Sequence, residues 1–253
     1  MSFKSWRSYY GFSESVRTKQ RYILDDESRD FLNSIIDTCE HRVRLIKSGI
    51  SFWRAQIGHE SKPVYVTPPD SDEQIHIDDE PVSFSFKRMK PLPDSASEGR
   101  ANPKGIPCLY VASDKETAMS EVRPWLEAKI SLGQLKIARD LKVLDFSVSL
   151  DDRKIRIYFE EPDIDKIIEA VWADIDDAFS RPIKSSDLQS DYAPTQIISE
   201  FIKSKGYDGI AYKSSLSDGY NIALFDLNSA EVVNCKLYEA SKIKFDFESV
   251  VEF

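Results

Sequence analysis

The sequence predicts a mixed α+β fold, with a β core, flanking helices and a helical N-terminal extension. Short apolar or alternating runs mark the strands, and segments with helical spacing lie between them without a regular βαβ period. The 253 residues are 41% hydrophobic and 11% aromatic, enough to bury a sizeable core. We therefore expect two regions, a helical extension over residues 1–49 and one large domain over residues 50–253.

The first predicted element is a helix over residues 25–47. Apolar side chains recur at helical spacing from Phe31 to Ile46, acidic residues begin the segment, and Ser48-Gly49 ends it. This amphipathic pattern is typical of a helix that packs on a neighbouring domain. A separate recognition module is the alternative that the pattern leaves open.

The predicted elements of the large domain follow in order along the chain. A strand over residues 50–58 precedes a long polar segment, residues 63–98, which is rich in Pro and Asp and is typical of a functional loop. The next elements are the strand PCLYVA, a helix from about Lys115, the strands QLKIARD and LKVLDFS, helices over residues 160–179 and 195–205, and the strands GYDGIAYKS, NIALFD and AEVVNCKLYEA.

Charge and cysteine usage narrow the classes of partner. The formal net charge of −9 repels phosphate backbones at long range and argues against broad nucleic-acid or anionic-membrane binding. An anionic ligand must therefore meet a local cluster of Arg or Lys. Cys39, Cys108 and Cys235 show neither CxxC spacing nor an even-numbered framework, so we expect reduced thiols and no zinc site. Because no apolar run approaches the ~20 residues that span a bilayer, and no signal-peptide h-region is seen, we expect a cytoplasmic protein.

A carboxylate in the helix after PCLYVA is the first candidate catalytic group. Ser113 and Glu116 form a capping-box pattern, and Pro124 limits the helix to a short one. Glu121 projects from an apolar-flanked face of this helix. Such a carboxylate, in a semi-buried site, can bond a ribose hydroxyl and stabilise the positive charge that develops at an anomeric carbon during glycosidic cleavage. A rim carboxylate paired to a nearby cation is the alternative.

Two arginines and a tyrosine are candidates for binding an anionic ligand with a flat ring. Arg54 lies in an apolar strand, where a charge is costly unless it meets an anion. Arg100 lies in a turn-rich segment that would hold its guanidinium at the lip of the next strand, and Asn102 in that segment is a further substrate-binding candidate. Tyr110 is either core or a ring against a heterocycle. For both arginines a salt-bridged or snorkelling side chain is the alternative.

Small polar side chains near the last strands complete the candidates. Ser214, Ser215 and Asn221 lie beside a Gly-containing turn, where they can reach phosphate or ribose oxygens or cap the turn. Neither serine has a GxSxG context, and the GxGxxG and P-loop motifs are absent. His76 belongs to a His–carboxylate alternation that fits a solvated loop better than a metal ligand, so we expect no metal site.

In their order along the chain, these segments resemble a known family. The successive blocks of the RES domain are similar to WRAQIG, to GRANPKG with PCLYVASDKETAMSE, and to DYAPTQIISEFIKSKGYDGIAYKSS with NIALF. The resemblance covers about residues 50–226. It places the family's two Arg at Arg54 and Arg100, its aromatic residue at Tyr110, its Glu at Glu121 and its Ser at Ser214.

The resemblance implies an ADP-ribosyltransferase-like fold and an enzyme that breaks the nicotinamide–ribose bond of NAD. NAD is then a substrate, no prosthetic group is needed, and inorganic phosphate or water accepts the ribosyl group. The same resemblance implies that Arg54 and Arg100 bind the pyrophosphate and that Tyr110 packs near nicotinamide or ribose. It also implies that Glu121 stabilises the oxocarbenium-like centre and that Ser214 orients ribose or phosphate.

The resemblance bears on partners as well. Family members are toxins of RES–Xre toxin–antitoxin pairs, which implies an Xre-type helix-turn-helix antitoxin as partner, without direct contact to nucleic acid or membrane. The chain departs from the family at Ala101, where an aromatic residue is usual, and at Lys213, where Pro is usual. These departures leave base stacking and phosphate preference open. Two alternatives also stay open, transfer to a protein side chain and a non-catalytic module that binds NAD or ADP-ribose.

Overall fold

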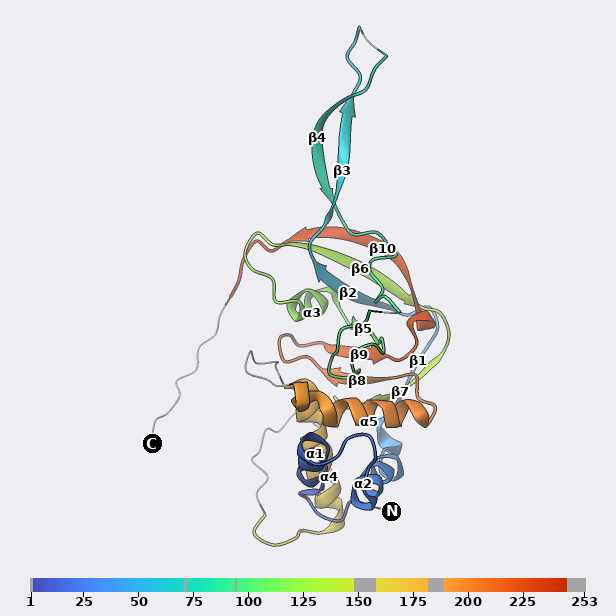
Figure 1. The fold of residues 1–253 in the computed structure, drawn as a ribbon, viewed down its shortest axis with the longest axis vertical. Helices are drawn as coiled ribbons and strands as arrows, with labels where there is room; N and C mark the ends of the chain where they lie inside the picture. The colour runs from blue at the N-terminus through green and yellow to red at the C-terminus, as the bar shows by residue number, and fades with distance from the viewer. Residues whose placement is uncertain (1, 71, 94, 148–157, 182–188, 245–253) are drawn as a thin grey trace, which may run out of the picture.

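An eight-stranded mixed sheet forms the centre of the computed structural model (Figure 1). The structure describes residues 2–70, 72–93, 95–147, 158–181 and 189–244. The strands of this sheet are β1 Val43–Ile46, β2 Ser51–Ile57, β5 Leu109–Ala112, β6 Lys129–Ile137, β7 Leu141–Asp145, β8 Gly209–Lys213, β9 Tyr220–Leu224 and β10 Ala230–Glu239. Their order is β1-β7-β8-β9-β5-β2-β6-β10, and β7 and β8 are the one parallel pair among them. The expected mixed α+β class with flanking helices is confirmed.

Four helices form a helical layer beside β8, in which two helices contact β8 and the other two pack mainly on helices, and a short fifth helix packs on β2 (Figure 1). The layer consists of α1 Ser8–Thr18, α2 Asp26–Asp37, α4 Ile164–Ser180 and α5 Ala193–Ser204, and the short helix is α3 Lys115–Glu121. Phe12, Phe31, Phe146 and Trp172 join the layer and the sheet in one buried cluster. The remaining turns of 3₁₀ helix span Glu40–Arg42, Gln189–Tyr192 and Leu227–Ser229. Among the described residues, none of these helices combines the length and apolarity that crossing a membrane requires.

The N-terminal segment is part of this same body. The Phe12 ring of α1 stacks on the Phe31 ring of α2 at a centroid distance of 4.5 Å, and both rings belong to the cluster that includes α4 and α5. β1 pairs with β7 and forms one edge of the main sheet. Residues 2–49 therefore contribute two helices and a strand to a core that they share with later elements, and the boundary at residue 49 stays a prediction.

The helix predicted over residues 25–47 is wrong in its second half. Asp25 caps α2 by accepting a bond from the Ser28 amide, as the acidic start predicts, but the helix ends at Asp37. Residues 43–46 are β1. Their apolar side chains fit the helical spacing by chance, and the backbone bonds that they gain by pairing with β7 decide the strand.

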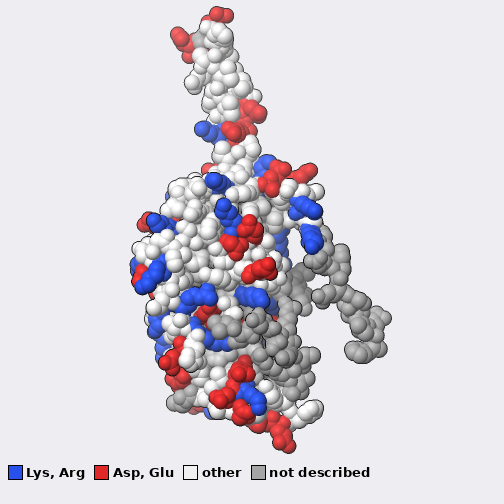
Figure 2. Space-filling model, turned by 180° about the vertical axis from the view of Figure 1, so that it is seen from behind, with Lys and Arg blue, Asp and Glu red and all other residues white. Residues whose placement is uncertain are grey.

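The polar segment predicted as a loop over residues 63–98 begins instead as a hairpin, with residues 71 and 94 outside the described residues. β3 Glu60–Val66 pairs with β4 Ile75–Val82, and this two-stranded sheet projects from the body (Figure 1). Asp and Glu side chains gather at its far end (Figure 2). Because Pro and Asp are uncommon in strands, the sequence pattern predicted a loop for this segment. Pro is tolerated in the hairpin because both of its strands are edge strands.

Candidate functional site

A cleft lies between β2 and β5, the two neighbouring strands of the main sheet that share the fewest paired residues. These two strands are joined by a single residue pair, Trp53 with Ala112. β2 pairs along its whole length with β6, and β5 pairs along its whole length with β9. The two halves of the sheet therefore diverge beside that pair, and a cleft of about 400 Å³ lies there. Its charged and polar lining consists of Arg54, Arg100, Tyr110, Glu121, Arg123, Ser180, Tyr212, Lys213, Ser215 and Asn221.

Glu121 is held at this cleft by two donors from other elements. The Ser214 hydroxyl donates to Glu121 Oε1 at 2.7 Å, and Asn221 Nδ2 donates to the same oxygen at 2.6 Å. Among the described residues, no group donates to Oε2. Glu121 is exposed rather than semi-buried, because it is the last residue of the short helix α3. The carboxylate is thus oriented by the protein and has one oxygen left for a ligand.

The helix that carries Glu121 begins differently from the predicted capping box. Asp114, not Ser113, is the N-cap residue, and its side chain accepts from the Thr117 amide at 2.7 Å. The Ser113 and Thr117 hydroxyls also donate to the Asp114 carboxylate. Thr117 Oγ1 lies 3.0 Å from Ser217 Oγ. This cluster ties the turn after β8 to the start of α3. It fixes the position of Ser214 relative to Glu121.

Replacing Gly219 with Ala is expected to destabilise the protein by about 1–3 kcal/mol. A Cβ atom there would lie 2.2 Å from Asp114 Oδ2 and 2.2 Å from Thr117 Oγ1, so the cap of α3 would have to open. Urea unfolding measures the change. The control is Gly11→Ala in α1, where a Cβ atom meets nothing within 4 Å. This control is expected to stabilise by about 0.5–1 kcal/mol, and shifts of the same sign in both variants would contradict the account.

Ser214 is a positioning group in this geometry. It is buried, its oxygen accepts from the Leu216 amide at 3.1 Å, and its hydroxyl hydrogen points to Glu121. A hydroxyl engaged in this way orients the carboxylate and is not free to attack a substrate. Its expected contact with ribose or phosphate stays a prediction.

Arg54 crosses the gap between the two halves of the sheet. Its Nη1 donates to the Tyr110 carbonyl at 3.1 Å, and its Nε is buried without a partner among the described residues. Burial lowers the pKa of Arg54 from its usual value because removal from water disfavours the charged form. A guanidinium still keeps its proton in a protein, so the cleft wall carries a charge with an unused donor. The Ser180 hydroxyl, which also lines the cleft, is a second buried polar group that has no hydrogen-bond partner among the described residues.

Arg100 is held at the opposite side of the cleft by the end of α4. Its guanidinium donates to the carbonyls of Phe179 and Arg181. These carbonyls lie at the negative end of the helix dipole, which favours a cation. Arg100 therefore lines the cleft but also closes a helix, and its expected contact with a pyrophosphate stays a prediction.

The remaining predicted site residues divide into two groups. Tyr110, Ser215 and Asn221 line the cleft. Asn102 does not, because it is buried and its amide donates to the carbonyls of its own loop while its oxygen accepts from the Tyr110 hydroxyl at 2.7 Å. Burial raises the pKa of Tyr110 well above its usual value, so this phenol stays protonated and donates to Asn102. Asn102 thus shapes the loop that carries Arg100.

Sequence reasoning missed several residues of the lining. Trp53 and Tyr212 each lie next to a cation that the sequence analysis named, and both line the cleft. Arg123 follows α3 with a φ of 48°, a left-handed conformation that is unusual for Arg. The proximity of Arg123 to Glu121 in sequence is the one signal that would have included it.

The sequence profile of the RES domain matches residues 76–248. The match includes Arg100, Tyr110, Glu121 and Ser214 and begins after Arg54. No curated protein matches the chain. Among solved structures, the chain is similar to a chain of the M. tuberculosis MbcT–MbcA toxin–antitoxin complex, with 14% identity, coverage of 81% of this chain and 91% of that chain, and a TM-score of 0.41. Because the profile spans well over half of the 253 residues, the chain belongs to the RES domain family.

Proposed function

We propose that the protein cleaves the nicotinamide–ribose bond of NAD, with inorganic phosphate or water as acceptor. The observation that carries the proposal is Glu121, a carboxylate fixed by two donors on one oxygen at a cleft whose other charged groups are all cationic. A carboxylate in this position stabilises positive charge that develops on a sugar carbon. The cationic groups suit the phosphates of the same substrate.

In this mechanism the glycosidic electron pair leaves with the nicotinamide nitrogen, which becomes neutral. Glu121 Oε2 faces the ribose as positive charge develops at C1. An oxygen of phosphate then forms the new bond to C1, which yields nicotinamide and ADP-ribose 1″-phosphate. With water as acceptor the products are nicotinamide, ADP-ribose and a proton. Arg54 and Arg100 hold the pyrophosphate, and Tyr110 packs beside the nicotinamide ribose.

The direct test is incubation of the purified protein with NAD, with and without phosphate, followed by mass measurement of the products. Nicotinamide release that depends on phosphate and gives a phosphorylated sugar product supports the phosphorylase. Release without that product supports hydrolysis. If no nicotinamide appears with either acceptor but NAD raises the melting temperature, the site binds the dinucleotide without cleaving it. A labelled protein band from labelled NAD and lysate would support ADP-ribosyl transfer instead.

We further propose that the protein is the toxin of a toxin–antitoxin pair, as the family resemblance implies. Loss of cellular NAD would stop growth, so expression of the chain alone is expected to arrest growth. Coexpression with an Xre-type antitoxin from the adjacent reading frame is expected to restore it. Growth arrest that persists with the variant Glu121→Gln would show that toxicity does not depend on NAD cleavage.

A further inference from the structure

A second cavity lies on the other side of Arg54 and is lined by cations. Its volume is about 630 Å³, and its lining includes Arg54, Lys87, Arg88 and Lys90 together with Pro91 and Leu92. Among the residues that the structure describes, which exclude Asp94, no Asp or Glu lines it. The chain has a net charge of −9, so four cations around one cavity make a positive region on an otherwise acidic protein. We call this cavity the basic groove.

The turn that carries these cations is anchored by two buried apolar side chains. Phe84 is buried, and its amide donates to the Ser131 hydroxyl at 2.9 Å. Met89 is 0% exposed and packs against Gly133 of β6, where a Cβ atom would lie 3.1 Å from its methyl carbon. Lys87 and Arg88 lie between these two anchors. The backbone of the basic turn is therefore held against the sheet.

The three cations of the turn differ in what they contact. Lys90 Nζ donates to the Leu227 carbonyl at 2.9 Å, which fixes it to the body. The Arg88 guanidinium lies over the Phe84 ring, 3.9 Å from its centroid, so its N–H edges stay available. Among the described residues, no carboxylate forms an ion pair with Lys87 or Arg88. Within the described part of the chain, Lys87 and Arg88 therefore have no carboxylate as a counter-charge.

Arg54 connects the basic groove to the cleft that holds Glu121. Arg54 is in the lining of both cavities, and its buried Nε has no partner in the described chain. An anionic ligand that crosses this point meets Glu121 on one side and Lys87 and Arg88 on the other. The arrangement fits an elongated ligand with phosphate near its middle.

We propose that the basic groove binds the adenosine-phosphate half of a dinucleotide whose ribosyl bond lies at Glu121. The proposal rests on the proposed function for the identity of that second half. A small phosphate ligand is favoured over nucleic acid because the net charge of −9 repels a long polyanion, whereas a small ligand meets the local cations. Pro91 and Leu92 supply the apolar surface that a base needs.

Calorimetric titration of the full chain with ADP and, separately, with nicotinamide mononucleotide tests the groove without requiring turnover. In the double variant Lys87→Ala/Arg88→Ala, the Kd for ADP is expected to rise about tenfold or more, because two charge-assisted contacts are lost. The affinity for nicotinamide mononucleotide is expected to stay the same. The control is Lys62→Ala/Lys242→Ala, which removes the same charge from exposed positions outside both cavities and should leave ADP binding unchanged.

The possible outcomes separate this proposal from the proposed function. Equal weakening of ADP binding in both double variants would overturn the groove, since general electrostatics would then explain it. Unchanged ADP binding in Lys87→Ala/Arg88→Ala would also overturn it, even if NAD is cleaved. ADP binding that depends on Lys87 and Arg88, in a protein that releases no nicotinamide, would support the groove while the cleavage proposal fails. A single-stranded oligonucleotide that binds more tightly than ADP would overturn the choice of a small ligand.

Discussion

Replacing Glu121 with Gln is expected to slow nicotinamide release by about 100-fold or more. The amide oxygen of Gln can still accept from Ser214 and Asn221, so the side chain keeps its position. What disappears is the negative charge opposite the developing positive charge on the ribose. Release of nicotinamide from saturating NAD measures the change. Because Glu121 is exposed, the melting temperature is expected to stay the same.

The matched control for this prediction is Glu116→Gln in the same helix. Glu116 is exposed in the first turn of α3 and does not line the cleft. Its replacement removes one negative charge from the same element and should leave the rate unchanged. A similar loss of rate in both variants would show that the net charge of α3 matters rather than the position of Glu121. Full activity of Glu121→Gln would exclude the proposed role.

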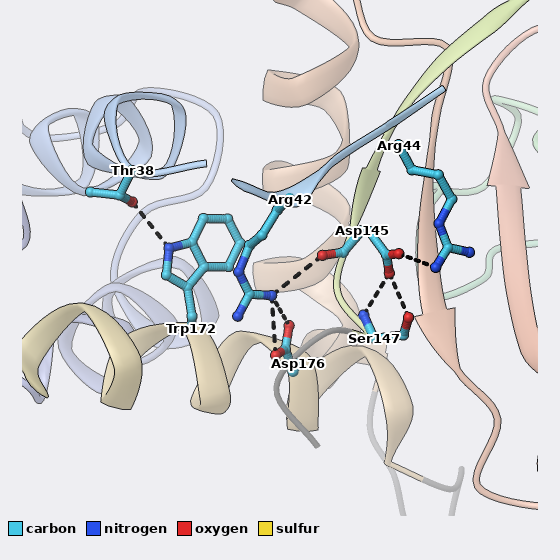
Figure 3. Close-up of polar contacts among 7 residues, drawn as sticks. All are labelled: Thr38, Arg42, Arg44, Asp145, Ser147, Trp172 and Asp176. Atoms are coloured by element: carbon cyan, nitrogen blue, oxygen red, sulfur yellow. Dashed lines mark hydrogen bonds and ion pairs between the residues drawn. The ribbon is translucent and has the colours of Figure 1, made fainter. Parts of the chain in front are cut away.

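The variant Asp176→Asn is expected to reduce the free energy of unfolding by about 3–5 kcal/mol. Figure 3 shows Asp176 of α4 beneath Arg42, whose guanidinium also lies over the Trp172 ring, 4.2 Å from its centroid. Arg42 Nη1 donates to both carboxylate oxygens, at 3.0 and 3.2 Å, and to the Asp145 carbonyl at 3.3 Å. Asp176 is 0% exposed and Arg42 is 9% exposed. The neutral amide would remove the Asp176 charge that the buried Arg42 guanidinium pairs with.

Thermal and urea unfolding measure this effect, and the melting temperature is expected to fall by roughly 10 °C or more. The control is Asp30→Asn, which breaks the exposed pair with Lys4 and should leave the free energy of unfolding nearly unchanged. The paired variant Arg42→Met/Asp176→Leu removes both charges and is expected to recover much of the stability. If the paired variant loses as much free energy of unfolding as Asp176→Asn, the packing of these side chains, rather than the unpaired charge, would explain the loss of stability.

This buried pair also bears on the cleft. Asp176 lies one turn before the end of α4, and the carbonyls of Phe179 and Arg181 at that end hold Arg100. On the other side of the same network, Asp145 pairs with Arg44 at 2.5 Å and accepts from the Ser147 amide and hydroxyl (Figure 3). The network therefore fixes α4 against β1 and β7. Through α4 it sets the position of one cation of the site.

Local pattern was enough to predict most elements that carry the site. The strand around Arg54, the short helix that ends at Glu121 and the strand before Ser214 all have apolar side chains at a clear period, bounded by turn residues. Their side chains are therefore oriented by secondary structure alone. The hairpin and the end of α2 were missed for the opposite reason. Partner strands decide those segments, and no local period shows a partner strand.

The cleft itself depends on contacts between distant parts of the chain. The sequence and its family resemblance predicted Arg54, Glu121 and Ser214 as catalytic residues and Asn221 as a substrate-binding residue. In the structure, Ser214 and Asn221 contact the Glu121 carboxylate. Only the tertiary structure shows that β2 and β5 pair at one residue and then diverge. The cavity lies at that divergence and includes Trp53 and Tyr212, whereas hydrogen bonds within its own loop keep Asn102 out of the lining. Hydrogen-bond register between strands far apart in sequence decides which side chains share a cavity, and periodicity within one segment carries no information about that register.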